Sequence, residues 1–205
     1  MSTRTPHSRD LFGVTALSAA HPAMRQLKRT HHATLHGNKS WSANYLLMDY
    51  LRQHPPEPGC QLLDVGCGFG LAGILCAKAF GAAVTAVDAD ESVFPFLQLH
   101  AAVNHVTIKT EQALFETISE PLLEASDWLI AADICFWDEL ADNVFELVER
   151  ACNAGVEKII IADPGRPPFW EMAEQCVEQF FAGIETRRIE TPRATQGVVM
   201  VIENA

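Results

Sequence analysis

Apolar positions along most of this chain alternate between short continuous runs and longer stretches with helical spacing. The short runs predict strands buried on both faces of a sheet. The predicted strands are 61–65, 83–88, 106–109, 128–132 and 158–162. The stretches with helical spacing between and after them are 71–80, 91–104, 139–151 and 169–181. Strands that alternate with helices predict a parallel sheet with helices on both faces.

The end of the chain breaks this alternation. Two further strands are predicted at 185–190 and 197–202, and only 191–196 separates them. So short a connection has no room for a crossover helix, so the two strands should pair as an antiparallel hairpin. The expected fold is therefore a three-layer, Rossmann-like α/β fold with a seven-stranded sheet and a C-terminal antiparallel hairpin.

The beginning of the chain has no clean period. Residues 1–36 are rich in Ser, Thr, His and basic residues, so we expect a partly disordered or loosely helical N-terminal extension. An apolar pattern with helical spacing begins near Asn38, with Ser40 as a plausible N-cap, and stops at the Pro-rich segment 54–59. A single domain over 37–205 suits a chain of 205 residues.

Composition narrows the class of protein. No apolar run reaches the roughly 18 residues of a spanning helix, and the polar N-terminus does not resemble a secretory signal. The six cysteines form no Cys-x-x-Cys pair and no zinc-ligand spacing, so we expect free thiols in the cytoplasm. His31, His32 and His36 lack acidic neighbours, and no metal is expected.

Charge is divided unevenly along the chain. Residues 1–40 carry six Lys/Arg and one acid, a net of +5, whereas 41–205 carry nine Lys/Arg and 25 acids, a net of −16. An acidic body disfavours nucleic-acid binding and suits a basic partner, although solubility alone explains it equally well. The oligomeric state is open.

A glycine-rich segment follows the first predicted strand and opens a helix. It reads Asp64-Val65-Gly66-Cys67-Gly68-Phe69-Gly70. Ligands bind at this end of strands in open α/β sheets, where glycine permits close approach and free N–H groups attract an anion. The segment 68–73 also matches the dinucleotide pattern G-x-G-x-x-G, with Asp88 20 residues after Gly68, and that pattern fits NAD equally well. A purely structural turn is a third interpretation.

Asp64 favours one of these interpretations. With it the segment reads D-x-G-x-G-x-G and resembles the first motif of class I S-adenosylmethionine-dependent methyltransferases, a fold that also ends in an antiparallel hairpin. The resemblance implies S-adenosylmethionine as cofactor, bound by Asp64, Gly66, Gly68 and Gly70. Asp88 would accept hydrogen bonds from both ribose hydroxyls. The alternative for Asp88 is a helix N-cap, a role for which Asp90 is better placed.

Three other segments resemble a narrower group. Asp133-Ile134-Cys135-Phe136 resembles the D-x-x-F/Y motif of the seven-strand protein lysine methyltransferases, in which a Trp is frequent at about the place of Trp41. Residues 133–142 and 163–167 together resemble the lysine methyltransferase of the electron transfer flavoprotein β-subunit, whose architecture the ribosomal protein L11 and nicotinamide N-methyltransferase-like groups share. That family commonly has Phe-Tyr where this chain has Phe136-Trp137.

The resemblance implies transfer of a methyl group to a lysine of a protein substrate. Phe136 and Trp137 would wall the acceptor and lower the pKa of the lysine by desolvation, Asp133 would orient the amine and contact the cofactor, and Trp41 would contact the cofactor. The alternative makes Phe136 core packing and Asp133 the N-cap of the next helix. Arg166 either holds an acidic surface of a partner or braces its own loop. Competing functions are a small-molecule N-methyltransferase, a cofactor-binding module without activity and an NAD-dependent oxidoreductase.

Overall fold

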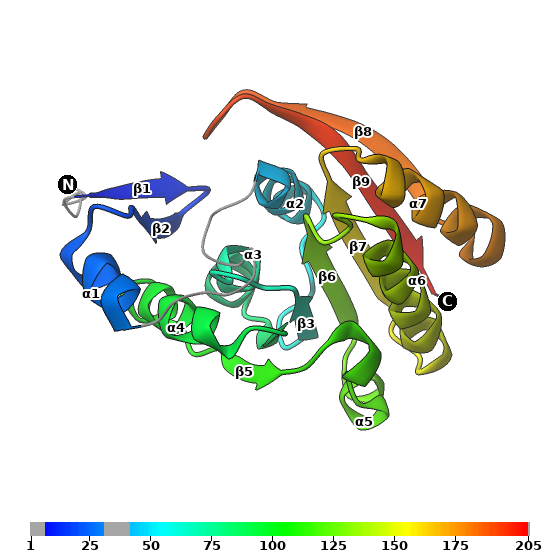
Figure 1. Cartoon of the computed structure of the whole chain (residues 1–205), viewed down its shortest axis with the longest axis horizontal. Coiled ribbons are helices and arrows are strands. Elements are labelled where there is room, and N and C mark those ends of the chain that lie inside the picture. Colours follow the sequence, from blue (N-terminus) through cyan, green and yellow to red (C-terminus); the bar gives the residue numbers. More distant parts are fainter. Residues whose placement is uncertain (1–6, 31–41, 205) are drawn as a thin grey trace.

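A seven-stranded sheet lies at the centre of the computed structural model, which describes residues 7–30 and 42–204 (Figure 1). The strand order is β5-β4-β3-β6-β7-β9-β8. The strands are β3 (Gln61–Val65), β4 (Ala83–Asp88), β5 (Lys109–Gln112), β6 (Trp128–Ala132), β7 (Lys158–Asp163), β8 (Gly183–Ile189) and β9 (Thr195–Glu203). All pairings are parallel except those of β9, which runs antiparallel to both β7 and β8. The predicted fold and its C-terminal hairpin are confirmed.

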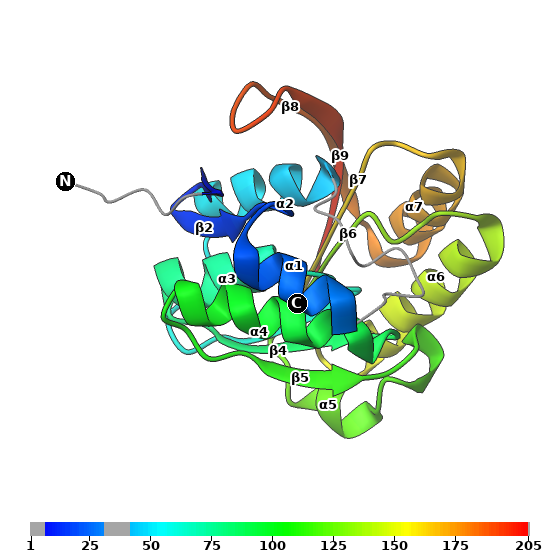
Figure 2. The same cartoon turned by 60° about the vertical axis from the view of Figure 1, so that its left-hand side comes forward.

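Helices cover both faces of this sheet (Figures 1 and 2). One layer contains α2 (Ser42–Gln53), α3 (Leu71–Leu75) and α4 (Phe94–Val103). The opposite layer contains α5 (Glu120–Glu124), α6 (Asp138–Asn153) and α7 (Pro167–Phe180). Neighbouring residues of one strand point to opposite faces, so Leu62 packs in the first layer and Leu63 in the second. Burial on both faces explains why the central strands β3, β6 and β7 are continuous apolar runs.

Two of the predicted helices are less regular than their spacing suggests. The segment predicted at 71–80 contains α3 followed by a π-helical turn (Cys76–Phe80), which ends at Gly81 in the left-handed conformation. The segment predicted at 91–104 begins with a 3₁₀ turn before α4. Asp90 caps that turn by accepting a hydrogen bond from the N–H of Ser92 at 3.0 Å, as predicted.

The strand predicted at 106–109 is wrong by about three residues. The observed β5 is polar and fully exposed, because it lies at the edge of the sheet and pairs only with β4. Ile108 is buried, but it belongs to the connection that precedes the strand. Its apolar side chain therefore marked the anchor of a loop and not the strand itself.

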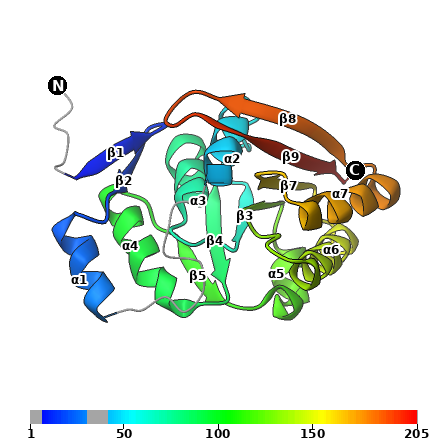
Figure 3. The same ribbon diagram turned by 45° about the horizontal axis from the view of Figure 1, so that its top comes forward.

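The N-terminal segment is more ordered than expected. Residues 7–30 form a hairpin of β1 (Ser8–Leu11) and β2 (Val14–Leu17), followed by α1 (Pro22–Thr30) beside α4 (Figure 3). The helix of α1 agrees with the helical part of the expectation, whereas the hairpin was missed because strands of four residues leave no periodic signal. The boundary predicted at 36/37 and the histidines at 31, 32 and 36 lie outside the described residues.

Side chains of α4 hold this hairpin in place. Asn104 accepts from the N–H of Thr15 at 2.8 Å and donates to its carbonyl at 2.9 Å. The buried imidazole of His100 accepts from the N–H of Leu17 at 3.1 Å through Nε2, and its Nδ1 lies 2.7 Å from the carbonyl of Phe96.

Across the described residues, no helix combines the length and apolar character needed to cross a membrane.

Candidate cofactor and acceptor site

A cavity of about 340 Å³ lies at the carboxyl ends of β3, β4 and β6. Its volume falls within the range of small-molecule sites, roughly 300–1,000 Å³. Eight of the nine predicted site residues line it, and the ninth, Trp41, lies outside the described residues. The eight are Asp64, Gly66, Gly68, Gly70, Asp88, Asp133, Phe136 and Trp137. The fold therefore brings together motifs that are far apart in the sequence, although the role of each residue stays a prediction.

The glycine loop needs glycine for reasons of space as well as conformation. Gly66, Gly68 and Gly70 have φ values of 63°, 51° and 66°, which L side chains rarely adopt. A Cβ on Gly66 would lie 2.6 Å from the side chain of Ile134, and one on Gly70 would lie 2.6 Å from that of Leu97. The loop is thus a close-fitting backbone wall of the cavity.

Asp64 joins the end of β3 to the helix that follows the loop. Its buried Oδ2 accepts a hydrogen bond from the N–H of Gly73 at 3.0 Å. Burial raises the pKa of Asp64 to about 7, the hydrogen bond from Gly73 opposes the rise, and the charge of Asp88 adds to it. A Cβ on Gly73 would lie 2.8 Å from the same oxygen. This contact accounts for the last glycine of the dinucleotide-like pattern.

Asp88 links the ends of two neighbouring strands. Its Oδ2 accepts from the N–H of Gly68 at 2.9 Å, and its Oδ1 accepts from the N–H of Asp90 at 3.0 Å. Each carboxylate oxygen keeps capacity for a second hydrogen bond toward the cavity. Burial raises the pKa of Asp88, against the effect of these two N–H groups. Because Asp90 is the N-cap of the following turn, the capping interpretation of Asp88 is wrong.

Asp133 and two aromatic residues also line the cavity. Asp133 has a φ of 63°, and its Oδ2 accepts from the N–H of Ala43 in the first turn of α2 at 3.3 Å. The N-cap position of α6 is occupied by Trp137, so Asp133 is not its cap. Phe136 is half-buried and Trp137 is 48% exposed, and both line the cavity. The centres of their two rings are 6.0 Å apart.

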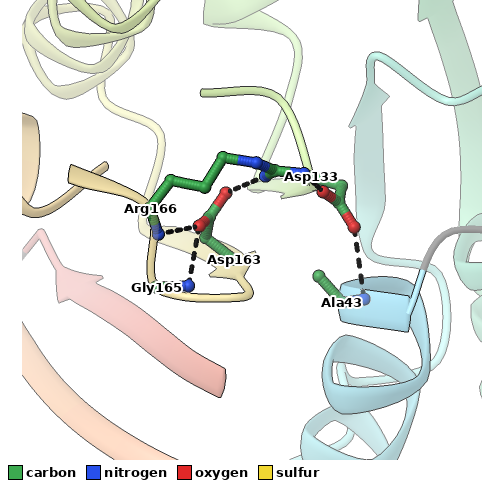
Figure 4. A network of polar contacts seen from close by, with 5 residues as sticks. All are labelled: Ala43, Asp133, Asp163, Gly165 and Arg166. Atoms are coloured by element: carbon green, nitrogen blue, oxygen red, sulfur yellow. Dashed lines mark hydrogen bonds and ion pairs between the residues drawn. The ribbon is translucent and has the colours of Figure 1, made fainter. Parts of the chain in front are cut away.

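Arg166 bridges the ends of β6 and β7 (Figure 4). Its Nη1 lies 2.7 Å from Oδ2 of Asp163, and its Nη2 pairs with Oδ1 of Asp133. The guanidinium also lies over the ring of Phe136, 4.6 Å from its centre. Of the two roles left open for Arg166, the structure supports the brace.

The sequence analysis did not predict that the segment after β5 lines the cavity. Leu114, Phe115 and Glu116 line the cavity, and Oε1 of Glu116 accepts from the side chain of Asn143 at 2.7 Å. Any loop at the carboxyl end of a parallel strand is a candidate for this edge of the sheet. The predicted strand ended too early for that rule to reach Phe115.

Comparison with known proteins finds similarity to methyltransferases. Residues 62–155 match a family described as a methyltransferase domain. The electron transfer flavoprotein beta subunit lysine methyltransferase of Danio rerio is 27% identical over 134 residues, which cover 63% of this chain and 50% of that protein. The ubiquinone biosynthesis O-methyltransferase of Neisseria meningitidis serogroup C (strain 053442) is 36% identical over 78 residues, 38% of this chain and 33% of that protein. The chain thus spans half or less of the length of these curated relatives.

A solved structure shows the same fold. The tRNA (uracil-54, C5)-methyltransferase of Pyrococcus abyssi, in complex with S-adenosyl-L-homocysteine, superposes with a TM-score of 0.61 at 19% identity, over 96% of this chain and 43% of that chain. The strand order, the antiparallel β9 and the matched domain agree. The matched domain, the relatives and the strand order together support a class I methyltransferase. The matched methyltransferase domain and the S-adenosyl-L-homocysteine bound by the Pyrococcus abyssi protein favour the S-adenosylmethionine interpretation of the glycine pattern over NAD.

Proposed function

We propose that this chain transfers the methyl group of S-adenosylmethionine to the side-chain amine of a protein lysine. The observation that carries the proposal is one cavity lined both by the glycine loop with Asp88 and by Asp133, Phe136 and Trp137. In this proposal the first set forms the donor end of the cavity and the second set forms the acceptor end. Methyl transfer is an in-line displacement, so both reactants must meet in one water-poor space.

The donor end fits the cofactor. Asp88 can accept hydrogen bonds from the two ribose hydroxyls, while the glycine backbone permits close approach of the methionine part. The described lining includes Asp64, Asp88, Glu116 and Asp133 and contains no Lys, Arg or His, which suits a cationic ligand. When bound, S-adenosylmethionine supplies an electrophilic methyl group on a positively charged sulfur.

The acceptor end suits an amine. The nitrogen lone pair forms the new N–C bond as the C–S bond breaks, and the bonding electrons stay on sulfur. The amine must first lose a proton, and its ordinary pKa is about 10.4. Phe136 and Trp137 would exclude water and lower that pKa, while the carboxylate of Asp133 would orient the N–H groups. The acidic lining favours an acceptor that arrives as a cation over a neutral phenol.

The names of the relatives support lysine as the methyl acceptor but do not decide between lysine and a small molecule. The Danio rerio relative is named a lysine methyltransferase and matches over 134 residues, whereas the O-methyltransferase relative matches over only 78. The short second match keeps a small-molecule acceptor as the alternative outcome. A protein acceptor requires an open mouth, and the exposure of Trp137 at the acceptor end agrees with one.

The cysteines support a cytoplasmic location for this reaction. All six lie within the described residues and are free. Burial raises the pKa of Cys176 to about 12, so its thiol stays protonated and unreactive. Free, unreactive thiols fit a reducing compartment.

Tritiated methyl transfer tests the proposal. The protein is incubated with methyl-labelled S-adenosylmethionine and a cell lysate, and the protein and small-molecule fractions are separated. Label in protein that acid hydrolysis releases as methyllysine supports the proposal. Label confined to small molecules would establish the alternative, and label in other amino acids would overturn the lysine assignment. The Asp88→Ala variant serves as the control with weakened cofactor binding.

A further inference from the structure

Two segments of the fold, the end of β7 and the connection that follows β6, meet on the side chain of Arg166. One nitrogen of its guanidinium pairs with Asp163 at the end of β7, and another pairs with Asp133 just after β6. The face of the same group covers Phe136. Asp163 is fixed in turn, because its Oδ1 accepts from the N–H groups of Gly165 and Arg166, both at 2.8 Å. Figure 4 shows the polar contacts of Arg166 with Asp133 and Asp163 as one network.

Through Asp133 the network extends to a third segment, α2. Oδ2 of Asp133 accepts from the N–H of Ala43, which lies in the first turn of α2. The first N–H groups of a helix have no partner within the helix. The orientation of the Asp133 carboxylate therefore couples the position of α2 to the acceptor end of the cavity.

The charges in this network do not cancel. The side chains of Asp133 and Asp163 are each 1% exposed, and one guanidinium faces both. Burial alone would lower the pKa of Arg166, but the two carboxylates outweigh burial and raise it, so the guanidinium stays charged. With both carboxylates ionised the network carries a formal charge of −1, which favours a cation at the acceptor end.

We propose that Arg166 is a positioning residue for methyl transfer: its planar fork sets the Asp133 carboxylate and the Phe136 ring at the acceptor end of the cavity. This inference rests on the proposed function, in that Asp133 and Phe136 face the lysine amine. Lysine cannot replace arginine here, because an ammonium is a point charge without the paired, planar donors and stacking face of a guanidinium.

The test compares Arg166→Lys with a matched control, Arg187→Lys. Arg187 also pairs with two carboxylates, Asp49 at 3.1 Å and Glu185 at 2.7 Å, and its guanidinium lies over the ring of Tyr50 at 5.2 Å. Neither arginine lines the cavity, but Arg166 pairs with a carboxylate that does, Asp133, whereas the partners of Arg187 do not. Both variants keep the positive charge and lose the planar, paired donors of arginine. The difference between them is that only Arg166 places these donors at the proposed acceptor end.

Two readouts follow. In Arg166→Lys, kcat for methyl transfer should fall by about 100-fold, since a displacement of roughly 1 Å can have that effect, while S-adenosylhomocysteine affinity stays within about threefold of the parent value. The amide of Ala43 should exchange its hydrogen about tenfold faster by NMR, because the acceptor that protects it is no longer fixed. Arg187→Lys should change neither quantity.

The outcomes separate this inference from the proposed function. Unchanged exchange at Ala43 in Arg166→Lys, or an unchanged kcat despite faster exchange, would overturn the positioning role. An equal loss of kcat in Arg187→Lys would also overturn it, because the effect would then be one of general stability. A parent protein that methylates no lysine would refute the proposed function, and the exchange at Ala43 would still test the network.

Discussion

Oδ2 of Asp88 accepts a hydrogen bond from the backbone N–H of Gly68 at 2.9 Å, so the end of β4 holds the cofactor loop that follows β3. The same carboxylate faces the cavity. Replacement of Asp88 by Ala removes both this contact and the proposed hydrogen bonds to ribose. We expect the affinity for S-adenosylhomocysteine to fall about 100-fold by calorimetry, the equivalent of two lost hydrogen bonds to a charged group.

The matched control for Asp88 is Asp127→Ala. Oδ2 of Asp127 accepts from the N–H of Gln61 at 2.7 Å, at the opposite end of β3, away from the cavity. It should lower stability without changing affinity. An Asp88→Ala protein that binds the ligand as the parent does would remove Asp88 from the cofactor site.

Asp133 is expected to affect chemistry more than cofactor binding. Asp133→Ala removes the carboxylate that faces the acceptor and also the partner of the Ala43 N–H. We expect kcat to fall by about 100-fold or more, while binding of S-adenosylhomocysteine remains measurable by calorimetry. If the variant methylates at the parent rate, Asp133 has a structural role only.

Trp137 should affect recognition of the acceptor. Its exposed ring lies at the acceptor end, where an aromatic face attracts a cation. Trp137→Ala should raise KM for the methyl acceptor about fivefold, equivalent to ~1 kcal/mol. Trp137→Phe keeps an aromatic face, so its KM should stay close to the parent value. Phe181→Ala, at a residue 90% exposed beyond α7, is the control. Equal effects of Trp137→Ala and Phe181→Ala would argue against a role in recognition.

Asp64 gives the stability of the ligand-free protein a defined pH dependence. Burial raises its folded-state pKa to about 7, above the ordinary aspartate value of about 3.9, so between these pKa values the folded state binds more protons than the unfolded state. Stability therefore decreases as pH rises through this window. Asp64→Asn keeps an acceptor for the N–H of Gly73 but carries no charge. Its stability relative to the parent should increase by on the order of 4 kcal/mol between about pH 4 and pH 8.

Thermal unfolding at several pH values measures this difference. Asp10→Asn, at an exposed turn where Oδ1 accepts from the N–H of Gly13 at 3.0 Å, is the comparison. A gap between the Asp64→Asn and parent proteins that does not widen with pH would contradict the burial of an ionisable Asp64.

The sequence predicted the sheet well where strands are buried on both faces. The runs at 61–65, 83–88 and 128–132 match β3, β4 and β6, because burial leaves a continuous apolar signal. The edge strand β5 has no such signal, so it was misplaced and Phe115 was missed. The short strands of the N-terminal hairpin are held by α4, a contact across about 90 residues that no local pattern reports.

The site was predicted in its parts but not in its contacts. The motifs gave Asp64, Asp88 and Asp133 as candidates, and all three line the cavity. Their partners are backbone N–H groups and one arginine, which only the fold brings near. Arg166 lies 33 residues from Asp133, and the pairing of β6 with β7 brings them together.

The cofactor is the basis of every other step, so its binding tests the account most directly. Calorimetric titration of the protein with S-adenosylhomocysteine and, separately, with NAD compares the two ligands that the glycine pattern fits. Saturable binding of S-adenosylhomocysteine, lost in Asp88→Ala, and no binding of NAD is the predicted result. Binding of NAD without binding of S-adenosylhomocysteine would contradict it.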